Sequence, residues 1–134
     1  MIRIPKTPIL VVDDYPANLI ALNAILDERV YDVLEAISGT QALEIALSRD
    51  IGVVLLDVQM PLMDGFEVAR QLRAHPRTRV VPIIFITAVH LDESETAGGY
   101  LRGEDYFSKP FDAGVLLAKV AAYASRYRRR IMPT

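Results

Sequence analysis

Short apolar runs alternate with longer helical patterns along the chain, and this alternation limits the possible folds more than any other feature. The runs lie at residues 9–12, 31–37, 52–56, 82–86 and 106–107. The runs at 9–12, 52–56 and 82–86 are continuously apolar, as strands are when both faces of a sheet are covered, whereas residues 31–37 mix polar and apolar side chains as an outer strand does. Strand–helix alternation repeated five times requires right-handed crossovers. The chain is therefore predicted to form an α/β fold with a parallel sheet between two layers of helices.

The segments between the runs carry helix signals. Pro16 suits the first turn of a helix, and residues 38–41, which begin with Ser and end with Gln, form a capping-box pattern. Two further helices are predicted to begin at Asp64 and at Asp112. The last of these carries a predicted apolar stripe formed by Leu116, Val120, Tyr123 and Tyr127. Residues 92–101 predict only a weak helix, because two adjacent glycines lie inside the segment.

The composition fits one compact domain. The chain has 134 residues, of which 51% are hydrophobic and 24% charged, so it is expected to fold rather than stay disordered. Cysteine is absent, which excludes disulfide scaffolds, thiolate metal sites and cysteine nucleophiles. The N-terminus does not resemble a signal peptide, and no apolar run approaches the roughly 20 residues that a membrane span needs. A cytoplasmic location is therefore expected.

The charges are distributed unevenly. All 17 Asp and Glu residues lie in residues 1–125, whereas four of the 15 Lys and Arg residues are Arg126, Arg128, Arg129 and Arg130. An acidic body argues against nucleic acid as a direct ligand, because phosphate backbones require a basic face. The arginine cluster has two interpretations: it complements the macrodipole at the end of a helix, or it contacts a membrane or a following domain.

Polar side chains follow the predicted strands. Asp13 and Asp14 follow the first strand, Asp57 the third, Thr87 the fourth and Lys109 the fifth. Because ligand sites in parallel sheets lie at the carboxyl ends of the strands, these side chains are expected to converge. Carboxylates about 4 Å apart repel one another by roughly 1 to 4 kcal/mol per pair, so a compensating cation is required. Lys109 supplies one charge, and Mg²⁺ is the natural source of the rest.

This set of side chains predicts phosphoryl-transfer chemistry. A carboxylate beside Mg²⁺ can attack a phosphoryl group and form an acyl phosphate. The oxygens of the transferred group then need cationic and hydrogen-bonding partners, which Lys109, Thr87 and the metal ion would provide.

Four segments resemble the receiver domain of two-component response regulators. They are residues 9–14 (ILVVDD), 56–65 (LDVQMPLMDG), 86–88 (ITA) and 105–111 (DYFSKPF). The resemblance extends over residues 8–127, and the second segment together with Lys109 and Pro110 makes it specific. It implies a flavodoxin-like, doubly wound (βα)5 fold, in which a five-stranded parallel sheet of strand order 2-1-3-4-5 has helices on both faces.

The same resemblance implies that Asp57 is the phosphoacceptor, and that a histidine kinase or a histidine phosphotransfer protein donates the phosphoryl group. It also implies a Mg²⁺ site that includes Asp57 and in which Mn²⁺ can substitute. Asp14 would ligate the ion directly and Asp13 largely through water. The backbone carbonyl of Gln59 would complete the protein's share of the ligands.

Further residues are implied to bind the phosphoryl group or to respond to it. Thr87 and Lys109 would bind the phosphoryl oxygens, and Ala88 is small at the point where the phosphoryl group must enter. Tyr106 matches the aromatic switch residue that turns inward when Thr87 moves. The peptide bond between Lys109 and Pro110 would be cis.

The resemblance divides the chain into an N-terminal extension (residues 1–7), a receiver domain (residues 8–127) and a basic C-terminal stub (residues 128–134). Such a receiver is not an enzyme, since it catalyses only its own phosphorylation and dephosphorylation. Phosphorylation would control a partner or an attached effector domain. The family also allows a homodimer through the face formed by the fourth helix, the fifth strand and the fifth helix.

Other functions that use similar folds fit these residues less well. A flavin-binding flavodoxin needs a hydroxyl- and glycine-rich phosphate loop after the first strand, where this chain has Asp13 and Asp14. A P-loop or dinucleotide-binding fold needs a glycine-rich loop at the same place. An aspartate-nucleophile phosphatase usually has a second Asp two residues after the nucleophile, where this chain has Gln59, which cannot act as a general acid.

Two alternatives remain closer to the receiver interpretation. The final helix, residues 115–128, is similar to that of receivers found in hybrid sensor kinases and multidomain regulators, so the chain could act as a phosphorelay intermediate within a hybrid histidine kinase. A pseudo-receiver that only binds partners would typically lack some of the acidic residues. All five residues of the predicted site are present in this chain, namely Asp13, Asp14, Asp57, Thr87 and Lys109.

Overall fold

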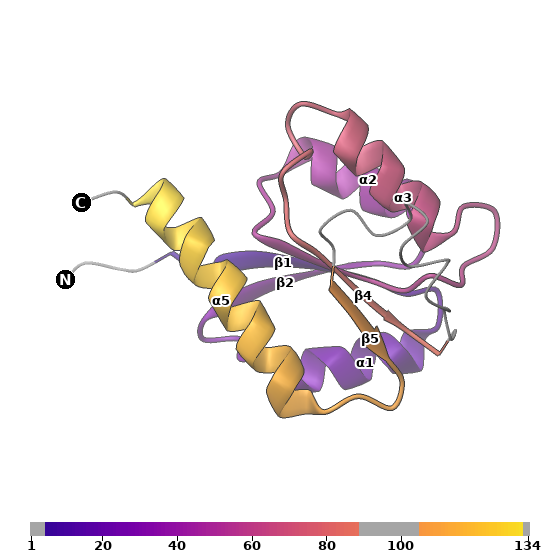
Figure 1. Ribbon diagram of the computed structural model, residues 1–134, viewed down its shortest axis with the longest axis horizontal. Helices are drawn as coiled ribbons and strands as arrows, with labels where there is room; N and C mark the ends of the chain where they lie inside the picture. The colour runs from indigo at the N-terminus through magenta and orange to yellow at the C-terminus, as the bar shows by residue number, and fades with distance from the viewer. Residues whose placement is uncertain (1–4, 89–104, 133–134) are drawn as a thin grey trace.

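A computed structural model describes residues 5–88 and 105–132 of the chain. Its centre is a five-stranded parallel sheet of strand order β2-β1-β3-β4-β5 (Figure 1). The strands are β1 (Thr7–Val12), β2 (Tyr31–Ala36), β3 (Val53–Leu56), β4 (Ile83–Thr87) and β5 (Asp105–Ser108). The helices of the described residues are α1 (Pro16–Ile25), α2 (Gly39–Ser48), α3 (Gly65–Ala74) and α5 (Ala113–Ile131). The predicted flavodoxin-like, doubly wound fold is confirmed, with α1 and α5 on one face of the sheet and α2 and α3 on the other (Figure 1).

Part of the sequence-based prediction concerns residues that the structure does not describe. The weak helix expected over residues 92–101, with Gly98 and Gly99, lies outside the described residues, and so does the fourth-helix part of the expected homodimer face. Within the part of the chain that is described, no helix combines the length and the apolar character that crossing a bilayer requires.

The two faces of the sheet build two hydrophobic clusters, because neighbouring side chains of a strand point to opposite faces. In β1, Leu10 and Val12 join the cluster under α2 and α3, whereas Ile9 and Val11 join the cluster under α1 and α5. All four side chains are at most 1% exposed. Burial on both faces explains why the central strands are continuously apolar in the sequence.

Most helices begin at the residues that the sequence predicted. α1 begins with a proline, and the side chains of Ser38, Asp64 and Asp112 each accept a hydrogen bond from the backbone N–H three residues later, at 3.1, 2.9 and 3.0 Å. The capping box at α2 differs from the usual form. The Gln41 side chain accepts from the backbone N–H of Ile37, one residue before the cap, at 2.7 Å.

The last helix is longer than the receiver boundary expected from the sequence. α5 continues to Ile131, so the arginines at 128–130 lie in its last turn, where cations complement the helix macrodipole. Its buried residues are Leu116, Val120, Ala124 and Tyr127. Tyr123, which was predicted as part of this stripe, is half-buried, and its hydroxyl donates a hydrogen bond to Asp105 at the start of β5. The domain bounds at residues 8–127 stay a prediction.

Candidate functional site

Three carboxylates meet at the carboxyl ends of β1 and β3, which are neighbours in the sheet. Asp13 and Asp14 directly follow β1, and Asp57 directly follows β3. Each residue offers a carboxylate oxygen, and these oxygens all lie within 4.8 Å of one another. Asp13 and Asp57 are 2% and 8% exposed, whereas Asp14 is open to solvent. The three carboxylates that the strand ends predicted therefore lie together.

Three donors, two from the beginning of α1 and one from the residue after β5, hold the Asp13 side chain. Its Oδ1 accepts from the backbone N–H of Tyr15 at 2.9 Å, and its Oδ2 accepts from the amide of Asn18 at 3.0 Å. The ammonium of Lys109, which follows β5, lies 3.4 Å from the same Oδ2 and brings a cation to the acidic cluster. Sequence reasoning missed Asn18, because an Asn early in a helix carries no signal of the carboxylate that it will meet.

The pKa of the Asp57 carboxyl is raised above its usual range, first because the group is buried and then because the Asp13 carboxylate lies nearby. A hydrogen bond from the Thr87 hydroxyl, the charge of Lys109 and a backbone hydrogen bond from Gln59 act in the opposite direction and lower this pKa. Because the pKa is raised overall, Lys109 and the hydrogen-bond donors do not fully offset the effects of burial and of repulsion by the Asp13 carboxylate. Carboxylate oxygens with such an excess of negative charge suit a hard divalent cation.

β4 and β5 bring the remaining predicted residues to the same edge. Thr87 is the last residue of β4 and is fully buried, and its carbonyl accepts a hydrogen bond from the backbone N–H of Lys109 at 2.9 Å. Ala88 follows and is exposed. Tyr106 pairs with β4 two residues before Thr87, is half-buried and packs against the cluster under α2 and α3. The peptide bond between Lys109 and Pro110 is cis.

Two backbone features shape the loop after Asp57. Gly65, the first residue of α3, donates its N–H to the carbonyl of Val58 at 2.8 Å, and a Cβ on Gly65 would lie 2.2 Å from the carbonyl oxygen of Asp57. Glycine therefore allows α3 to begin directly against the backbone of Asp57. Leu62 has a φ of 71°, in the left-handed region, and its side chain is fully exposed. The sequence had indicated Gly65 only as the start of a helix, and it carried no signal for the conformation of Leu62.

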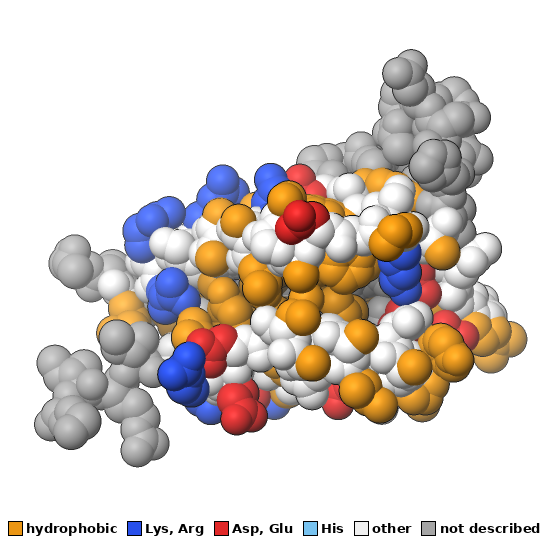
Figure 2. Space-filling model, turned by 90° about the horizontal axis from the view of Figure 1, so that it is seen from below, with side chains coloured by type: hydrophobic (Ala, Val, Ile, Leu, Met, Phe, Trp, Pro, Cys, Tyr) orange, Lys and Arg blue, Asp and Glu red, His pale blue; other side chains and the backbone are white. Residues whose placement is uncertain are grey.

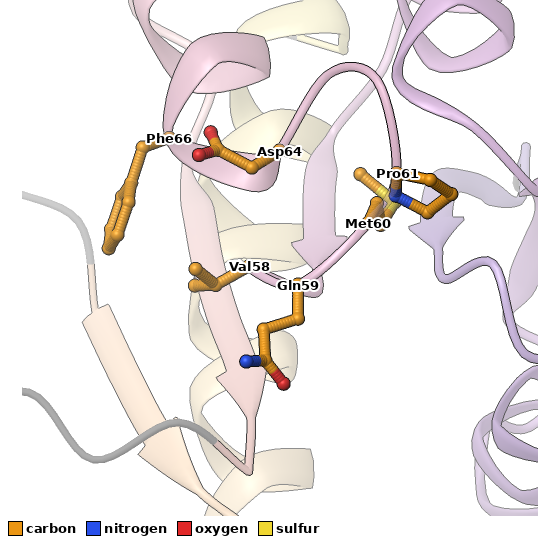
Figure 3. Close-up of a pocket in the computed structure, with 6 residues that line it drawn as sticks. All are labelled: Val58, Gln59, Met60, Pro61, Asp64 and Phe66. Carbon is orange, nitrogen blue, oxygen red and sulfur yellow. The ribbon is translucent and has the colours of Figure 1, made fainter.

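A hollow of about 540 Å³ lies beside this loop (Figure 3). It is lined by Val58, Gln59, Met60, Pro61, Asp64 and Phe66. The Gln59 side chain extends away from the Asp64 carboxylate, which caps α3 (Figure 3). The residue two positions after Asp57 is thus a neutral amide, which has no acidic proton to donate to a leaving group.

The family can now be assigned from comparisons with known proteins. A sequence model of the response regulator receiver domain matches residues 9–121 of this chain. The chain belongs to the response regulator receiver family. Members of this family act in two-component signalling and are generally not enzymes, although some relatives carry attached catalytic domains.

Relatives of this receiver differ in length. The response regulator PleD of Caulobacter vibrioides is 42% identical over 113 residues, which is 84% of this chain and 25% of PleD. The protein PilH of Pseudomonas aeruginosa is 33% identical over 114 residues, which is 85% of this chain and 94% of PilH. The chain spans only a quarter of PleD and half of the Synechocystis transcriptional regulator RpaA.

Solved receiver structures are similar in fold. The receiver domain of the sensor histidine kinase PA1611 from Pseudomonas aeruginosa matches with a TM-score of 0.79 and 30% identity, covering 90% of this chain and 99% of that one. That structure has a magnesium ion coordinated in its active-site cleft. The chemotaxis protein CheY4 of Vibrio cholerae matches with a TM-score of 0.78 and 27% identity, covering 89% of this chain and 99% of that one. The flavodoxin-like receiver fold is therefore confirmed by independent structures.

Proposed function

We propose that this receiver accepts a phosphoryl group on Asp57 from the phosphohistidine of a histidine kinase or a histidine phosphotransfer protein. The observation that carries the proposal is the cluster of Asp13, Asp14 and Asp57, whose carboxylate oxygens lie within 4.8 Å of one another beside Lys109 and Thr87. A cytoplasmic location is part of the same proposal, because the donor's phosphohistidine is made from ATP.

The proposed transfer is a single displacement at phosphorus. An ionised oxygen of Asp57 forms the new P–O bond while the P–N bond to the donor's imidazole breaks, and the electron pair of that bond stays on the imidazole nitrogen. Lys109 would bind a phosphoryl oxygen through its ammonium, and Thr87 would do so through its hydroxyl. Ala88 is small and exposed, so it leaves room for the group to enter.

The acidic cluster fits Mg²⁺, because the donors are hard oxygens and the pKa of Asp57 is raised partly by the Asp13 carboxylate. Asp14 and Asp57 would hold the ion directly, together with the backbone carbonyl of Gln59. Asp13 would act largely through water, since both of its oxygens already accept hydrogen bonds. The bound ion would neutralise negative charge on the carboxylates and on the entering phosphoryl oxygens. Mn²⁺ is expected to substitute.

The signal is proposed to leave the site through Thr87 and Tyr106. Thr87 would move toward the phosphoryl group and leave space that Tyr106 can fill from the adjacent strand. The changed face would then bind a partner, an attached domain or a second copy of the chain. Hydrogen exchange is expected to change most in residues 88–108, of which 89–104 lie outside the described residues, and on the facing side of α5. It is expected to change little around α2 at residues 42–47.

Incubation with acetyl phosphate and Mg²⁺ tests the chemistry. Intact-mass measurement should find one added phosphoryl group, which hydroxylamine removes as it does from an acyl phosphate. The variant Asp57→Asn should add none, and the matched variant Asp64→Asn, which changes a carboxylate that caps α3, should still react. Modification of Asp57→Asn at the wild-type level would contradict the proposal.

A phosphorelay role is a second candidate, because the PA1611 receiver and other similar structures belong to sensor histidine kinases. In that role Asp57 would pass its phosphoryl group to a second histidine. Radiolabelled, purified phosphoprotein mixed with a histidine phosphotransfer protein distinguishes the two roles. Transfer of the label supports the relay, whereas loss only as inorganic phosphate supports a receiver that signals by its own conformation.

A further inference from the structure

The edge of the sheet opposite Asp57 carries an excess of positive charge. In a parallel, doubly wound sheet this edge is formed by the beginnings of the strands and the ends of the helices. We define the basic edge as residues 5–6, 26–30, 49–52, 75–82 and 128–132. Its cations are Lys6, Arg29, Arg49, Arg77, Arg79, Arg128, Arg129 and Arg130, and its carboxylates are Asp27, Glu28 and Asp50. Figure 2 shows Lys and Arg side chains gathered toward the end of the molecule where α5 ends.

Cations from different elements of the basic edge converge in space. Arg49 after α2, Arg77 before β4 and Arg130 at the end of α5 line one small cleft of about 30 Å³ together with Asp50. Arg49 pairs with Asp32 at 3.1 Å and Arg77 with Asp50 at 3.8 Å, so among the described residues Arg130 is the cation of this cleft that forms no ion pair. Arg29 and Arg128, which are far apart in the sequence, line a second and wider hollow of about 310 Å³. Cations from separate parts of the chain therefore meet at two places on the basic edge.

The arginines at the end of α5 are not neutralised by carboxylates. Arg128 donates to the Thr7 hydroxyl at 3.4 Å, Arg129 donates to the Ser125 hydroxyl at 3.1 Å, and the Arg130 guanidinium lies 5.4 Å from the centre of the Tyr127 ring. Within the described ranges, none of these three arginines forms an ion pair. Their charges are thus available to an external anion.

Apolar side chains are exposed among these cations. Val80 is 68% exposed, and Val30, Ile131 and Met132 are 38–42% exposed. All four belong to the basic edge. Guanidinium groups bind phosphate oxygens through paired N–H donors. Moving exposed aliphatic side chains from water into the boundary between lipid head groups and acyl chains lowers the free energy. A nucleic acid backbone would use the arginines but would leave the aliphatic groups in water.

We propose that the basic edge docks on an anionic lipid surface, with the arginines at lipid phosphates and the four aliphatic side chains at the head-group boundary. The opposite edge would then face away from the lipid. That edge carries Asp13, Asp14, Asp57, Asp64 and Asp112 against the single cation Lys109 among the described residues, so an anionic surface would repel it. This docking is independent of phosphorylation.

Vesicle sedimentation tests the proposal on the whole chain. We expect binding to vesicles of phosphatidylcholine mixed with phosphatidylglycerol, little binding to phosphatidylcholine alone, and a loss of binding as salt screens the charges. The variant Arg129→Gln/Arg130→Gln should bind about 30-fold more weakly, since each basic residue contributes on the order of 1 kcal/mol near an anionic surface. The variant Val80→Asn/Ile131→Asn should also bind more weakly.

The matched control Arg70→Gln/Lys119→Gln removes the same charge from α3 and α5 outside the basic edge, and should bind like the wild type. Thermal unfolding of each variant checks that it is folded. The proposal is overturned if the wild type binds both vesicle types equally or neither, or if the control weakens binding as much as the arginine variant. It is also overturned if duplex DNA, added at an equal phosphate concentration, is bound in preference to the vesicles.

Discussion

The Asp57 carboxyl has to be ionised to act as a nucleophile, yet burial and the nearby Asp13 carboxylate raise its pKa. The hydroxyl of Thr87 and the ammonium of Lys109 lower the same pKa without fully cancelling these effects. The ionised form of Asp57, which is the form that reacts, is therefore also the form that destabilises the folded state.

We expect Asp57→Asn to raise the free energy of unfolding of the metal-free protein by about 1 kcal/mol at neutral pH, because the substitution removes repulsion between carboxylates. The folded-state pKa of Asp57 is raised, so the folded protein binds this proton more tightly than the unfolded chain. The contribution of protonated Asp57 to the free energy of unfolding of the wild type is therefore fully present at acidic pH. It is lost as the pH rises through the raised pKa.

Urea unfolding over a pH series measures this difference. The wild type and Asp57→Asn should be closest at acidic pH and should separate toward neutral pH. The variant Asp14→Asn provides a control with a smaller effect, because Asp14 is exposed to solvent. A stability difference between the wild type and Asp57→Asn that does not change with pH would contradict this account.

Leu62 adopts a left-handed backbone conformation, with a φ of 71°, that costs an L-residue about 1 kcal/mol, and its exposed side chain gains nothing from burial. Leu62→Gly should therefore raise the free energy of unfolding by up to about 1 kcal/mol. Ile20→Gly is a matched control, because Ile20 is also exposed but lies within α1, and it should lower the stability by about 0.5–1 kcal/mol. Destabilisation by both variants would show that the Leu62 conformation is not strained.

At the scale of secondary-structure elements, side chains of α5 connect this helix to the beginning of β5. The Tyr123 hydroxyl donates to the Asp105 carboxylate, and the Lys119 ammonium lies 3.4 Å from the other oxygen of the same carboxylate. Arg126 lies over the Tyr123 ring at 5.2 Å. Since Asp105 directly precedes Tyr106, these contacts hold the strand that carries the proposed switch residue.

The variant Tyr123→Phe should lower the free energy of unfolding by about 1 kcal/mol, because it removes the hydrogen bond to Asp105. Burial, followed by the Asp105 carboxylate, raises the pKa of Tyr123 to about 12. The folded state therefore holds the phenolic proton more tightly than the unfolded chain, and the associated stability is present below pH 10 and is lost as pH rises toward 12.

Spectroscopic titration of tyrosinate should find one tyrosine with a pKa near 12 that is missing from Tyr123→Phe. Arg126→Gln serves as a comparison, because it leaves the hydrogen bond intact while it removes a charge that lowers this pKa. If all tyrosines titrate near pH 10, the link between α5 and β5 is absent.

Strand ends and helix starts could be predicted because they depend on local patterns. Apolar runs end at Asp13, Asp57 and Thr87, and the parallel topology alone brings these residues to one edge. The hydrogen bond from Asn18 to Asp13 and the contact between Tyr123 and Asp105 could not be predicted, because each joins side chains whose meeting depends on the full path of the backbone. The half-buried position of Tyr123 was missed for the same reason, since helical spacing does not locate the edge of a buried stripe.

At the scale of the whole molecule, metal binding and folding should be linked. A ligand that binds only the folded state stabilises it by about 2.7 kcal/mol at a hundredfold excess over its dissociation constant. We therefore expect Mg²⁺ to raise the melting temperature of the wild type. The increase should be much smaller in Asp57→Asn, whereas Asp64→Asn should respond like the wild type. A wild-type melting temperature that does not respond to Mg²⁺ would exclude the proposed site.

The opposite charges of the two edges also affect how fast the molecule meets other macromolecules. A protein with a negative and a positive end turns in the field of an approaching charged body, so a larger fraction of collisions occurs in a productive orientation. A phosphohistidine donor with basic residues around its active histidine would be guided toward the Asp57 edge before any contact forms. Added salt should slow such association far more than it speeds dissociation. Because the charges are separated between the two edges, a small domain with a net charge of only −2 can still be oriented by an approaching charged partner.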